Sequence, residues 1–140
     1  MDFSHFTEPQ RESVKTLDRP LLICAGAGSG KTFTLTQRIT WTLMPGSAGE
    51  NKAFLQDIGQ ALVITYTHKA ASEIKERIRA NLRSEGMVEQ ALKVDAAWIS
   101  TIHGACLRIL QEHALELGIN PELELLEPAE SNDIREQAIQ

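Results

Sequence analysis

Apolar residues recur along the chain in two alternating patterns, one typical of helices and the other typical of buried strands. Apolar positions three and four residues apart predict helices, and continuous apolar runs predict short strands covered on both faces. The predicted helices cover 7–17, 31–44, 69–85 and 103–117, and the predicted strands cover 21–24, 61–64 and 98–100. Strands that alternate with helices are characteristic of parallel βαβ units, so the sequence predicts an α/β fold with a parallel sheet flanked by helices.

Polar residues and glycines mark the ends of these elements. Thr7-Glu8-Pro9-Gln10 has the pattern of a capping box, in which Thr7 accepts from the backbone and Gln10 reaches back. Residues 45–53 are expected to form a loop, and Gly118 is expected to end the last helix. Weaker patterns favour a short strand over 122–127 and a further helix from Ser131.

Charge is divided unevenly along the chain. With 140 residues, of which 42% are hydrophobic, the chain can bury one modest core. The net charge of -5 argues against a nucleic-acid partner, yet residues 1–110 hold 13 basic and 11 acidic side chains, whereas 111–140 hold one basic and eight acidic. We therefore expect part of one domain over 1–118 and a separate acidic segment over 119–140.

Two further features of the composition limit the function classes. No apolar run approaches the roughly 20 residues of a membrane-spanning helix, and the start of the chain lacks the basic and apolar regions of a signal peptide. We expect a soluble, cytoplasmic chain with no membrane partner. Cys24 and Cys106 have no partner at metal-ligand spacing, so both are expected to be small buried hydrophobic residues.

A glycine-rich segment follows the first predicted strand and precedes a predicted helix. Its residues are Ala25-Gly26-Ala27-Gly28-Ser29-Gly30-Lys31-Thr32. Glycines let the backbone curl so that its N–H groups converge on phosphate oxygens at a helix N-terminus. In such a loop Lys31 meets the β- and γ-phosphates and the Thr32 hydroxyl binds Mg²⁺. The alternative is a plain glycine-rich turn that caps a helix, but the strand before it and the helix after it favour a phosphate loop.

Gln10 has two interpretations. It shares a helix face with Val14 and Leu17, which turns its amide toward the protein interior. There the amide can read an adenine edge by accepting from the exocyclic amine and donating to a ring nitrogen. Alternatively, Gln10 only completes the capping box. Spacing alone leaves both interpretations open.

Two later junctions between a strand and a helix carry polar residues. Thr65-Tyr66-Thr67-His68-Lys69 opens a helix whose charged residues over 69–83 sum to +3, which suits single-stranded nucleic acid with Tyr66 as a stacking ring. The alternative is a solvated helix face stabilised by a Glu73–Arg77 pair. The second junction, Ser100-Thr101-Ile102-His103-Gly104, offers hydroxyls, an imidazole and backbone N–H groups, although His103 can also be a simple capping residue. In a parallel sheet all such junctions lie at one edge.

Taken in order, these segments resemble the superfamily-one helicases of the UvrD, Rep and RecB/AddA type. Residues 7–14 resemble the Q motif of that family, and residues 25–32 resemble its motif I, including the leading Ala. Residues 65–74 resemble motif Ia, and residues 100–104 resemble motif Ib. The resemblance implies a P-loop NTPase fold, here part of a RecA-like domain, that uses ATP and Mg²⁺. It also implies 3′ to 5′ translocation on single-stranded DNA in repair or recombination, driven by closure against a second RecA-like domain of the same polypeptide.

The resemblance also assigns roles to residues. Lys31 and Thr32 become the catalytic residues, with Thr32 reaching Mg²⁺ through the nucleotide, and Gln10 becomes a reader of adenine. Residues 25–32 and Phe33 complete the nucleotide site. The DNA path falls to Thr65, Tyr66, Thr67, His68, Lys69, Thr101, Ile102 and His103.

Several positions depart from the UvrD pattern. Phe33 stands where an Arg that packs on adenine is common, so it can stack on the base but cannot donate a hydrogen bond. His68 replaces the usual Asn, Tyr66 replaces Phe, and Ile102 replaces the Phe of motif Ib. Together with 106–108 and 120–126, Ile102 looks closer to the RecB/AddA helicase-nucleases.

Two components of a complete motor are missing from the sequence. Hydrolysis in this class needs an apolar strand that ends in Asp-Glu and arginines from a second domain, whereas residues 125–127 offer only Leu-Leu-Glu. We therefore expect this chain to be the front part of a larger helicase. By itself, this part is expected to bind nucleotide at most and not to hydrolyse it. Two alternatives are a non-enzymatic nucleic-acid-binding module, which leaves the phosphate loop unexplained, and a small P-loop kinase, for which no lid or acceptor segment is found.

Overall fold

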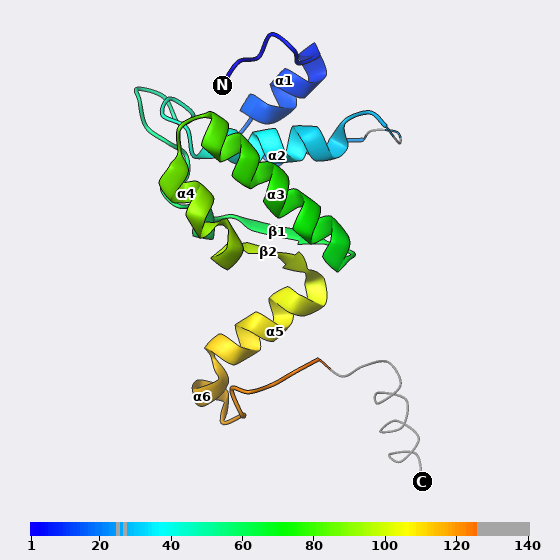
Figure 1. Ribbon diagram of the computed structural model, residues 1–140, viewed down its shortest axis with the longest axis vertical. Coiled ribbons are helices and arrows are strands. Elements are labelled where there is room, and N and C mark those ends of the chain that lie inside the picture. Colours follow the sequence, from blue (N-terminus) through cyan, green and yellow to red (C-terminus); the bar gives the residue numbers. More distant parts are fainter. Residues whose placement is uncertain (25, 27, 126–140) are drawn as a thin grey trace. The chain divides into compact units, whose positions relative to one another are not determined.

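The computed structural model describes residues 1–24, 26 and 28–125, which fold as two compact units (Figure 1). The first unit is Met1–Ser100, and the second begins at Thr101. The helices of the first unit are α1 (Glu8–Lys15), α2 (Lys31–Thr42), α3 (His68–Ser84) and α4 (Val88–Lys93). Short 3₁₀ turns at Ile58–Gln60 (η1) and Val94–Ala96 (η2) precede the strands β1 (Leu62–Thr65) and β2 (Trp98–Thr101), and the second unit contains α5 (Ile102–Glu112) and α6 (Ala114–Leu117).

Helix α1 begins at the predicted capping box. The Thr7 side chain accepts from the Gln10 backbone, and the Gln10 side chain accepts from the Thr7 backbone. The helix ends at Lys15, two residues before the predicted end, because Thr16 is extended. Its buried face carries Val14 and rests on α2, where Arg38 donates to the Ser13 carbonyl. Partial burial lowers the pKa of the Arg38 guanidinium.

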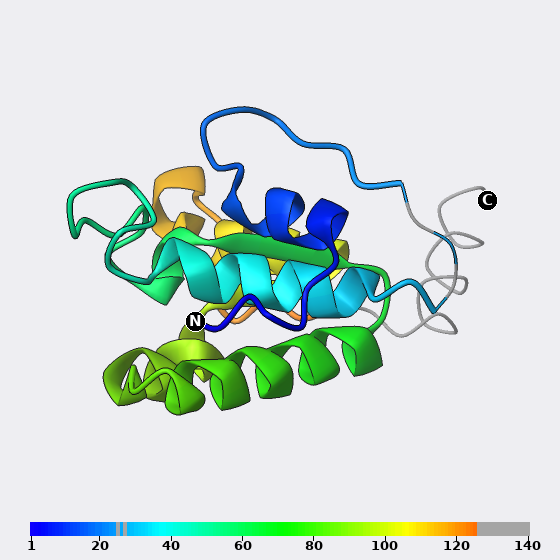
Figure 2. The same cartoon turned by 90° about the horizontal axis from the view of Figure 1, so that it is seen from above.

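Helix α2 lies between α1 and α3 and joins the N-terminal segment to the main core (Figure 2). Its residues Ile39 and Leu43 are buried, as their spacing predicts. The apolar stripe of α3 is buried as predicted at Ala71, Ile74, Ile78 and Leu82. The three larger side chains, Ile74, Ile78 and Leu82, form one cluster with residues of η1, η2 and both strands, so the core of the first unit is built around α3.

Strands β1 and β2 pair as a two-stranded parallel sheet (Figure 1). The sequence predicts both strands, and each ends one residue later than its apolar run. Helix α3 lies between them in sequence and contacts β1, as in a βαβ crossover. Helix α4 and the two 3₁₀ turns are not predicted, because they are too short to show a helical period. The α/β class is therefore confirmed.

The prediction of a buried strand at 21–24 is wrong. The described residues there form neither a helix nor a strand, and Leu22 is 87% exposed. Cys24 is also exposed, contrary to expectation. A strand is held by hydrogen bonds to a neighbour, and in the part of the chain that the structure describes the only ladder joins β1 to β2. The apolar run indicates a preference for burial but does not supply the partner.

Helix forms in the second unit over most of the range that the sequence predicts, but the single helix expected over 103–117 is divided into α5 and α6 at His113. Thr101 caps α5, and Gly118 ends α6 in the left-handed conformation with φ 66°. The expected inward face is wrong, however. Ala105 and Ala114 are buried in this unit, whereas the four residues expected in the core are exposed. Those exposed residues are Cys106, Ile109, Leu110 and Leu117.

The predictions for the end of the chain can be compared with the structure only in part. Residues 122–125 form no strand. The rest of that predicted strand and the helix expected from Ser131 lie outside the described residues. The boundary expected at 118 stays a prediction. No helix within the described ranges is long and apolar enough to cross a membrane.

Candidate functional site

The glycine-rich loop leads directly into helix α2. Gly28 and Gly30 have φ of 77° and 83°, the left-handed region that glycine adopts without strain. Gly30 is the N-cap of α2 and supplies no side-chain cap, so the first N–H groups of the helix can serve an anion. Two of the predicted loop residues, Ala25 and Ala27, lie outside the described residues. The positive φ of these two glycines is compatible with a phosphate loop, and phosphate binding by this loop stays a prediction.

The Gly26 carbonyl is the centre of the loop. It accepts from Lys31 Nζ at 2.7 Å and from Ser29 Oγ at 2.7 Å. The Ser29 backbone N–H donates to the same oxygen at 3.4 Å. Donors of this kind bind phosphate oxygens in nucleotide sites, and here they converge on a backbone oxygen instead.

Gln10 connects helix α1 to this loop. Its Oε1 accepts from the Thr7 N–H at 3.1 Å, and the Gln10 N–H donates to Thr7 Oγ1 at 3.4 Å, which confirms the capping box. Its Nε2 donates to the Ser29 carbonyl at 3.3 Å. Adenine recognition by Gln10 stays a prediction. The amide and Lys31 line a cavity of about 310 Å³ between α1 and the loop.

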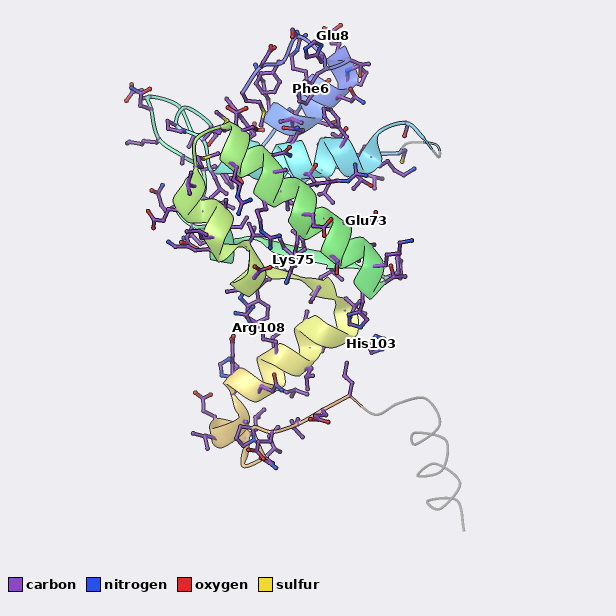
Figure 3. All side chains as sticks on the ribbon, viewed as in Figure 1. Phe6, Glu8, Glu73, Lys75, His103 and Arg108 are labelled. Atoms are coloured by element: carbon purple, nitrogen blue, oxygen red, sulfur yellow. The ribbon has the colours of Figure 1, made fainter. Side chains whose placement is uncertain are left out.

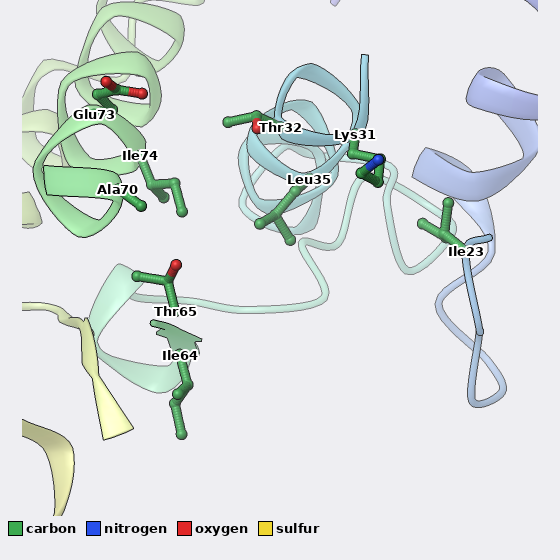
Figure 4. Close-up of a pocket in the computed structure, with 9 residues that line it drawn as sticks. All are labelled: Ile23, Lys31, Thr32, Leu35, Ile64, Thr65, Ala70, Glu73 and Ile74. Carbon is green, nitrogen blue, oxygen red and sulfur yellow. The ribbon is translucent and has the colours of Figure 1, made fainter. Parts of the chain in front are cut away.

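A second cavity, of about 340 Å³, lies on the other side of the loop (Figure 4). Lys31 and Thr32 at the start of α2 form one wall, and Thr65 at the end of β1 forms another. The remaining lining residues are Ile23, Leu35, Ile64, Ala70, Glu73 and Ile74. Residues expected at the phosphates thus share a cavity with the first residue of the next motif.

The loop after β1 presents an aromatic ring to solvent. Tyr66 is 98% exposed, and His68 and Lys69 are exposed beside it. The Thr67 hydroxyl accepts from the Ala70 N–H at 3.1 Å, so it caps α3. An exposed ring at a helix start is suited to stacking on a base.

The basic helix α3 divides its charges between two sides. Lys75 Nζ donates to the Asp95 carbonyl at 3.1 Å, and Arg79 pairs with the Asp95 carboxylate, so both face η2. Glu73 lies on the other side of the helix (Figure 3), where it lines the same cavity as Thr32 (Figure 4). The alternative Glu73–Arg77 pair is absent among the ion pairs of the described residues. The +3 charge over 69–83 therefore overstates what this helix can offer a ligand.

Glu73 is a site residue that the sequence reasoning missed. The sequence pattern suggests it only as a partner for Arg77. The available signal was periodicity, because Ala70 and Glu73 fall on the same helical face as the buried Ile74. That face borders the cavity of Lys31 and Thr32.

The third junction belongs to the second unit. Thr101 is buried, and its hydroxyl accepts from the Gly104 N–H at 3.2 Å as the cap of α5. Ile102 is 52% exposed and His103 is exposed, so both can meet a ligand. That this junction shares an edge with the other two stays a prediction.

Phe33 packs within an aromatic group at the start of the chain. Its ring centroid lies 5.0 Å from that of Phe6, which in turn contacts Phe3 at 5.1 Å. Phe3 reaches Trp41 in an edge-on contact, and Lys15 Nζ lies 4.4 Å above the Phe3 ring. This group fixes α1 against α2, and stacking of Phe33 on a base stays a prediction.

Thr32 is the residue that fits a Mg²⁺ ion carried by nucleotide. Its side chain is exposed and lines the cavity beside Lys31. Within the described residues, no group of three or more His, Cys, Asp and Glu side chains could hold a metal by itself. An ion held here through Thr32 would take most of its ligands from phosphate and water, as Mg²⁺ commonly does.

Comparison with known proteins adds independent findings. A family model described as the UvrD/REP helicase N-terminal domain matches residues 6–140. The ATP-dependent DNA helicase PcrA of Staphylococcus aureus is 36% identical over 131 residues, which cover 94% of this chain and 16% of that protein. PcrA of Bacillus subtilis is 41% identical over 121 residues, covering 86% of this chain and 14% of that protein.

A helicase-nuclease is also similar. An ATP-dependent helicase/nuclease subunit of Listeria welshimeri is 32% identical over 143 aligned positions, covering 96% of this chain and 11% of that protein. The chain thus spans 16% or less of the length of these three relatives.

Proposed function

The chain belongs to the UvrD/REP helicase N-terminal domain family, and from this premise we propose that it forms the ATP-binding part of an ATP-dependent DNA helicase. The observation that carries the proposal is the start of α2. There a glycine N-cap, Lys31 and Thr32 follow a loop whose donors already converge on one oxygen, Gly26 O. That arrangement is suited to binding a triphosphate at a helix N-terminus.

At the nucleotide, each described residue has a distinct task. The Lys31 ammonium exchanges the Gly26 carbonyl for the β- and γ-phosphate oxygens, and the α2 N-terminus faces the same charge. The Thr32 hydroxyl would hold the Mg²⁺ that accompanies the nucleotide, and the chemistry supplied by that ion would be neutralisation of charge on the phosphates. Gln10 and Phe33 lie on the α1 side, where the base is expected.

At the nucleic acid, we assign Tyr66 and Lys69 to single-stranded DNA, with His68 beside them. Tyr66 offers a stacking face, and Lys69 offers a charge for a phosphate. Thr65 and Thr67 shape the loop that presents Tyr66, since Thr67 caps α3. Ile102 and His103 provide a further contact from the start of α5, where Thr101 acts as the cap.

The shared cavity supports coupling between the two ligands. Thr32 lies at the phosphate side of the cavity, and Thr65 lies one residue before the stacking ring of Tyr66. A change of phosphate state at Lys31 and Thr32 would therefore be felt in the same cavity that Thr65 lines, next to the DNA loop. In the whole polypeptide this coupling would drive 3′ to 5′ translocation with a second RecA-like domain, in repair or recombination.

Two finer points belong to the proposal. Ile102 and the residues around it support a place near the helicase-nuclease branch, to which the Listeria welshimeri relative belongs by its name. The 140-residue chain by itself binds nucleotide without hydrolysing it, because its sequence holds no Asp-Glu pair to orient water. Titration with a fluorescent ATP analogue, with and without Mg²⁺, distinguishes this chain from a non-enzymatic DNA-binding module.

The direct test is Lys31→Ala in the full-length polypeptide that carries this chain. We expect the variant to lose DNA-stimulated ATPase activity while it keeps its affinity for single-stranded DNA, because Lys31 contacts phosphate and not DNA. Lys52→Ala, in the loop after α2, is the matched control and should leave both properties unchanged. Retained ATPase activity in Lys31→Ala would refute the assignment.

A further inference from the structure

The Gln10 side chain bridges two elements that lie 19 residues apart in sequence. One end of its amide belongs to the start of α1, where Oε1 accepts from the Thr7 N–H at 3.1 Å. The other end belongs to the phosphate loop, where Nε2 donates to the Ser29 carbonyl at 3.3 Å. A residue that only capped α1 would not need the second contact.

The helix cap fixes which way this amide points. The Thr7 backbone group is an N–H donor, so only the oxygen of the Gln10 amide can satisfy it. The nitrogen is thereby directed away from α1 and toward the loop. Reversing the amide would place two donors against each other at Thr7 and two acceptors against each other at Ser29, so the cap and the loop contact support the same orientation.

On the loop side, the amide sets the orientation of one peptide group. The Ser29–Gly30 peptide is trans, so its C=O and its N–H point in opposite directions. Holding the Ser29 carbonyl on Gln10 therefore turns the Gly30 N–H away from Gln10. Gly30 is also packed closely against the amide, since a Cβ at this position would lie 2.9 Å from Nε2. The next residues along the chain are Lys31 and Thr32.

We propose that Gln10 is a positioning residue for the phosphate loop: through the Ser29 carbonyl it holds the peptide that begins α2 in the orientation that binds phosphate. This inference rests on the proposed nucleotide site and adds a role for Gln10 that is independent of the base. Its consequence is that Gln10 contributes to the binding of phosphate ligands that carry no adenine.

Two variants remove the donor to Ser29 in different ways. Gln10→Glu keeps an oxygen for the Thr7 N–H, and Glu is an accepted partner in a capping box, so the α1 cap survives. Gln10→Met is similar in length and adds no charge near the phosphates. Thr7→Ala is the matched control, since it removes one bond of the cap and leaves the amide of Gln10 in place. Helix content by circular dichroism verifies that all three fold.

The measurement is displacement of a bound fluorescent ATP analogue from the full-length polypeptide by Mg²⁺·ATP and by Mg²⁺·tripolyphosphate. Loss of one hydrogen bond should weaken both competitors by about three- to tenfold in Gln10→Glu and Gln10→Met. Thr7→Ala should stay within about twofold of wild type for both, because a helix cap alone does not contact the loop.

The outcomes separate this inference from the proposed function. Weakened ATP with unchanged tripolyphosphate would assign Gln10 to the base alone and overturn the positioning role while leaving the nucleotide site intact. Equal losses in Thr7→Ala and the Gln10 variants would also overturn it, because the effect would then come from the helix cap. A wild-type protein that ATP displaces but tripolyphosphate does not would count against it as well. A wild-type protein that binds no nucleotide would refute the proposed function itself.

Discussion

Gly30 offers a prediction that the structure makes quantitative. Replacing it with Ala forces an L-residue into the left-handed region at φ 83°, which costs roughly 1–2 kcal/mol. The new Cβ would also lie 2.9 Å from Gln10 Nε2, a separation that real side chains do not tolerate. The amide must then move and give up its bond to Ser29, which costs about 0.5–1.5 kcal/mol more. The expected loss of unfolding free energy is about 1.5–3.5 kcal/mol.

Gly28 is the matched control for Gly30. It has nearly the same conformation, with φ 77°, but a Cβ there meets nothing within 4 Å. Gly28→Ala should therefore lose only the backbone contribution of roughly 1–2 kcal/mol. The difference between the two variants, about 1 kcal/mol, measures the contact with Gln10 without the backbone strain.

Urea unfolding followed by helix circular dichroism gives the required free energies. The cycle that combines Gly30→Ala with Gln10→Ala tests the cause, because the steric part of the loss should vanish once the amide is gone. Equal losses in Gly30→Ala and Gly28→Ala would refute the reasoning. So would a Gly30→Ala loss that is unchanged in the Gln10→Ala background.

Two further predictions concern acid stability and DNA binding. Asp57 accepts from Lys93 Nζ at 2.8 Å, and this bond lowers the pKa of the Asp57 carboxyl below its ordinary value. The carboxylate therefore stabilises the fold fully above the ordinary pKa, and this stabilisation is lost as the pH falls through the lowered pKa. Urea midpoints between about pH 5 and pH 2 should therefore fall less steeply in Asp57→Asn than in wild type, and parallel curves would contradict this. Tyr66→Ala should weaken binding of single-stranded oligonucleotides by about 1–3 kcal/mol, whereas Tyr66→Phe keeps the stacking face and should bind nearly normally. Fluorescence anisotropy measures both, and equal weakening in the two Tyr66 variants would assign the contact to the hydroxyl.

Local patterns predicted the elements whose causes are local. The stripe of α3 is buried where its period places it, because Ile74, Ile78 and Leu82 share one face. The capping box at Thr7 forms as its four residues indicate, and Gly118 ends α6 in the left-handed conformation. In each case the residues that decide the structure lie within a few positions of one another.

Elements that depend on a distant partner could not be predicted in the same way. Residues 21–24 have the composition of a buried strand, but composition does not supply the neighbour that would pair with them. The apolar residues of α5, such as Ile109, are exposed for a similar reason, since a stripe favours burial without naming what covers it. The prediction that Cys24 is buried depends on the same strand, and it is wrong for the same reason.

The candidate site also combines a feature that local sequence predicts with contacts between residues distant in the sequence. Glycine spacing predicts a phosphate loop, and the positive φ of Gly28 and Gly30 is compatible with it, while phosphate binding there stays a prediction. The contacts of Gln10 with Ser29 and of Lys31 with Gly26 involve backbone carbonyls, whose directions no side chain in the sequence specifies. The pairing of Lys75 and Arg79 with Asp95 could not be predicted either, because η2 approaches α3 only in the folded unit. These two cations are therefore engaged within the protein.

The hydrogen bonds within the loop limit how much each phosphate contact can add to nucleotide affinity. The Gly26 carbonyl holds Lys31 Nζ at 2.7 Å, so an arriving phosphate replaces one acceptor by another. Because the phosphate is charged, such an exchange yields about 1.5–3 kcal/mol, which is still less than the roughly 4–6 kcal/mol of an isolated amide–carbonyl hydrogen bond. When direct contacts contribute so little each, the orientation of the loop before binding becomes comparable in importance. That is why Gln10, which contacts the loop through Ser29, is expected to matter about as much for phosphate binding as a neutral hydrogen-bond donor in the loop itself.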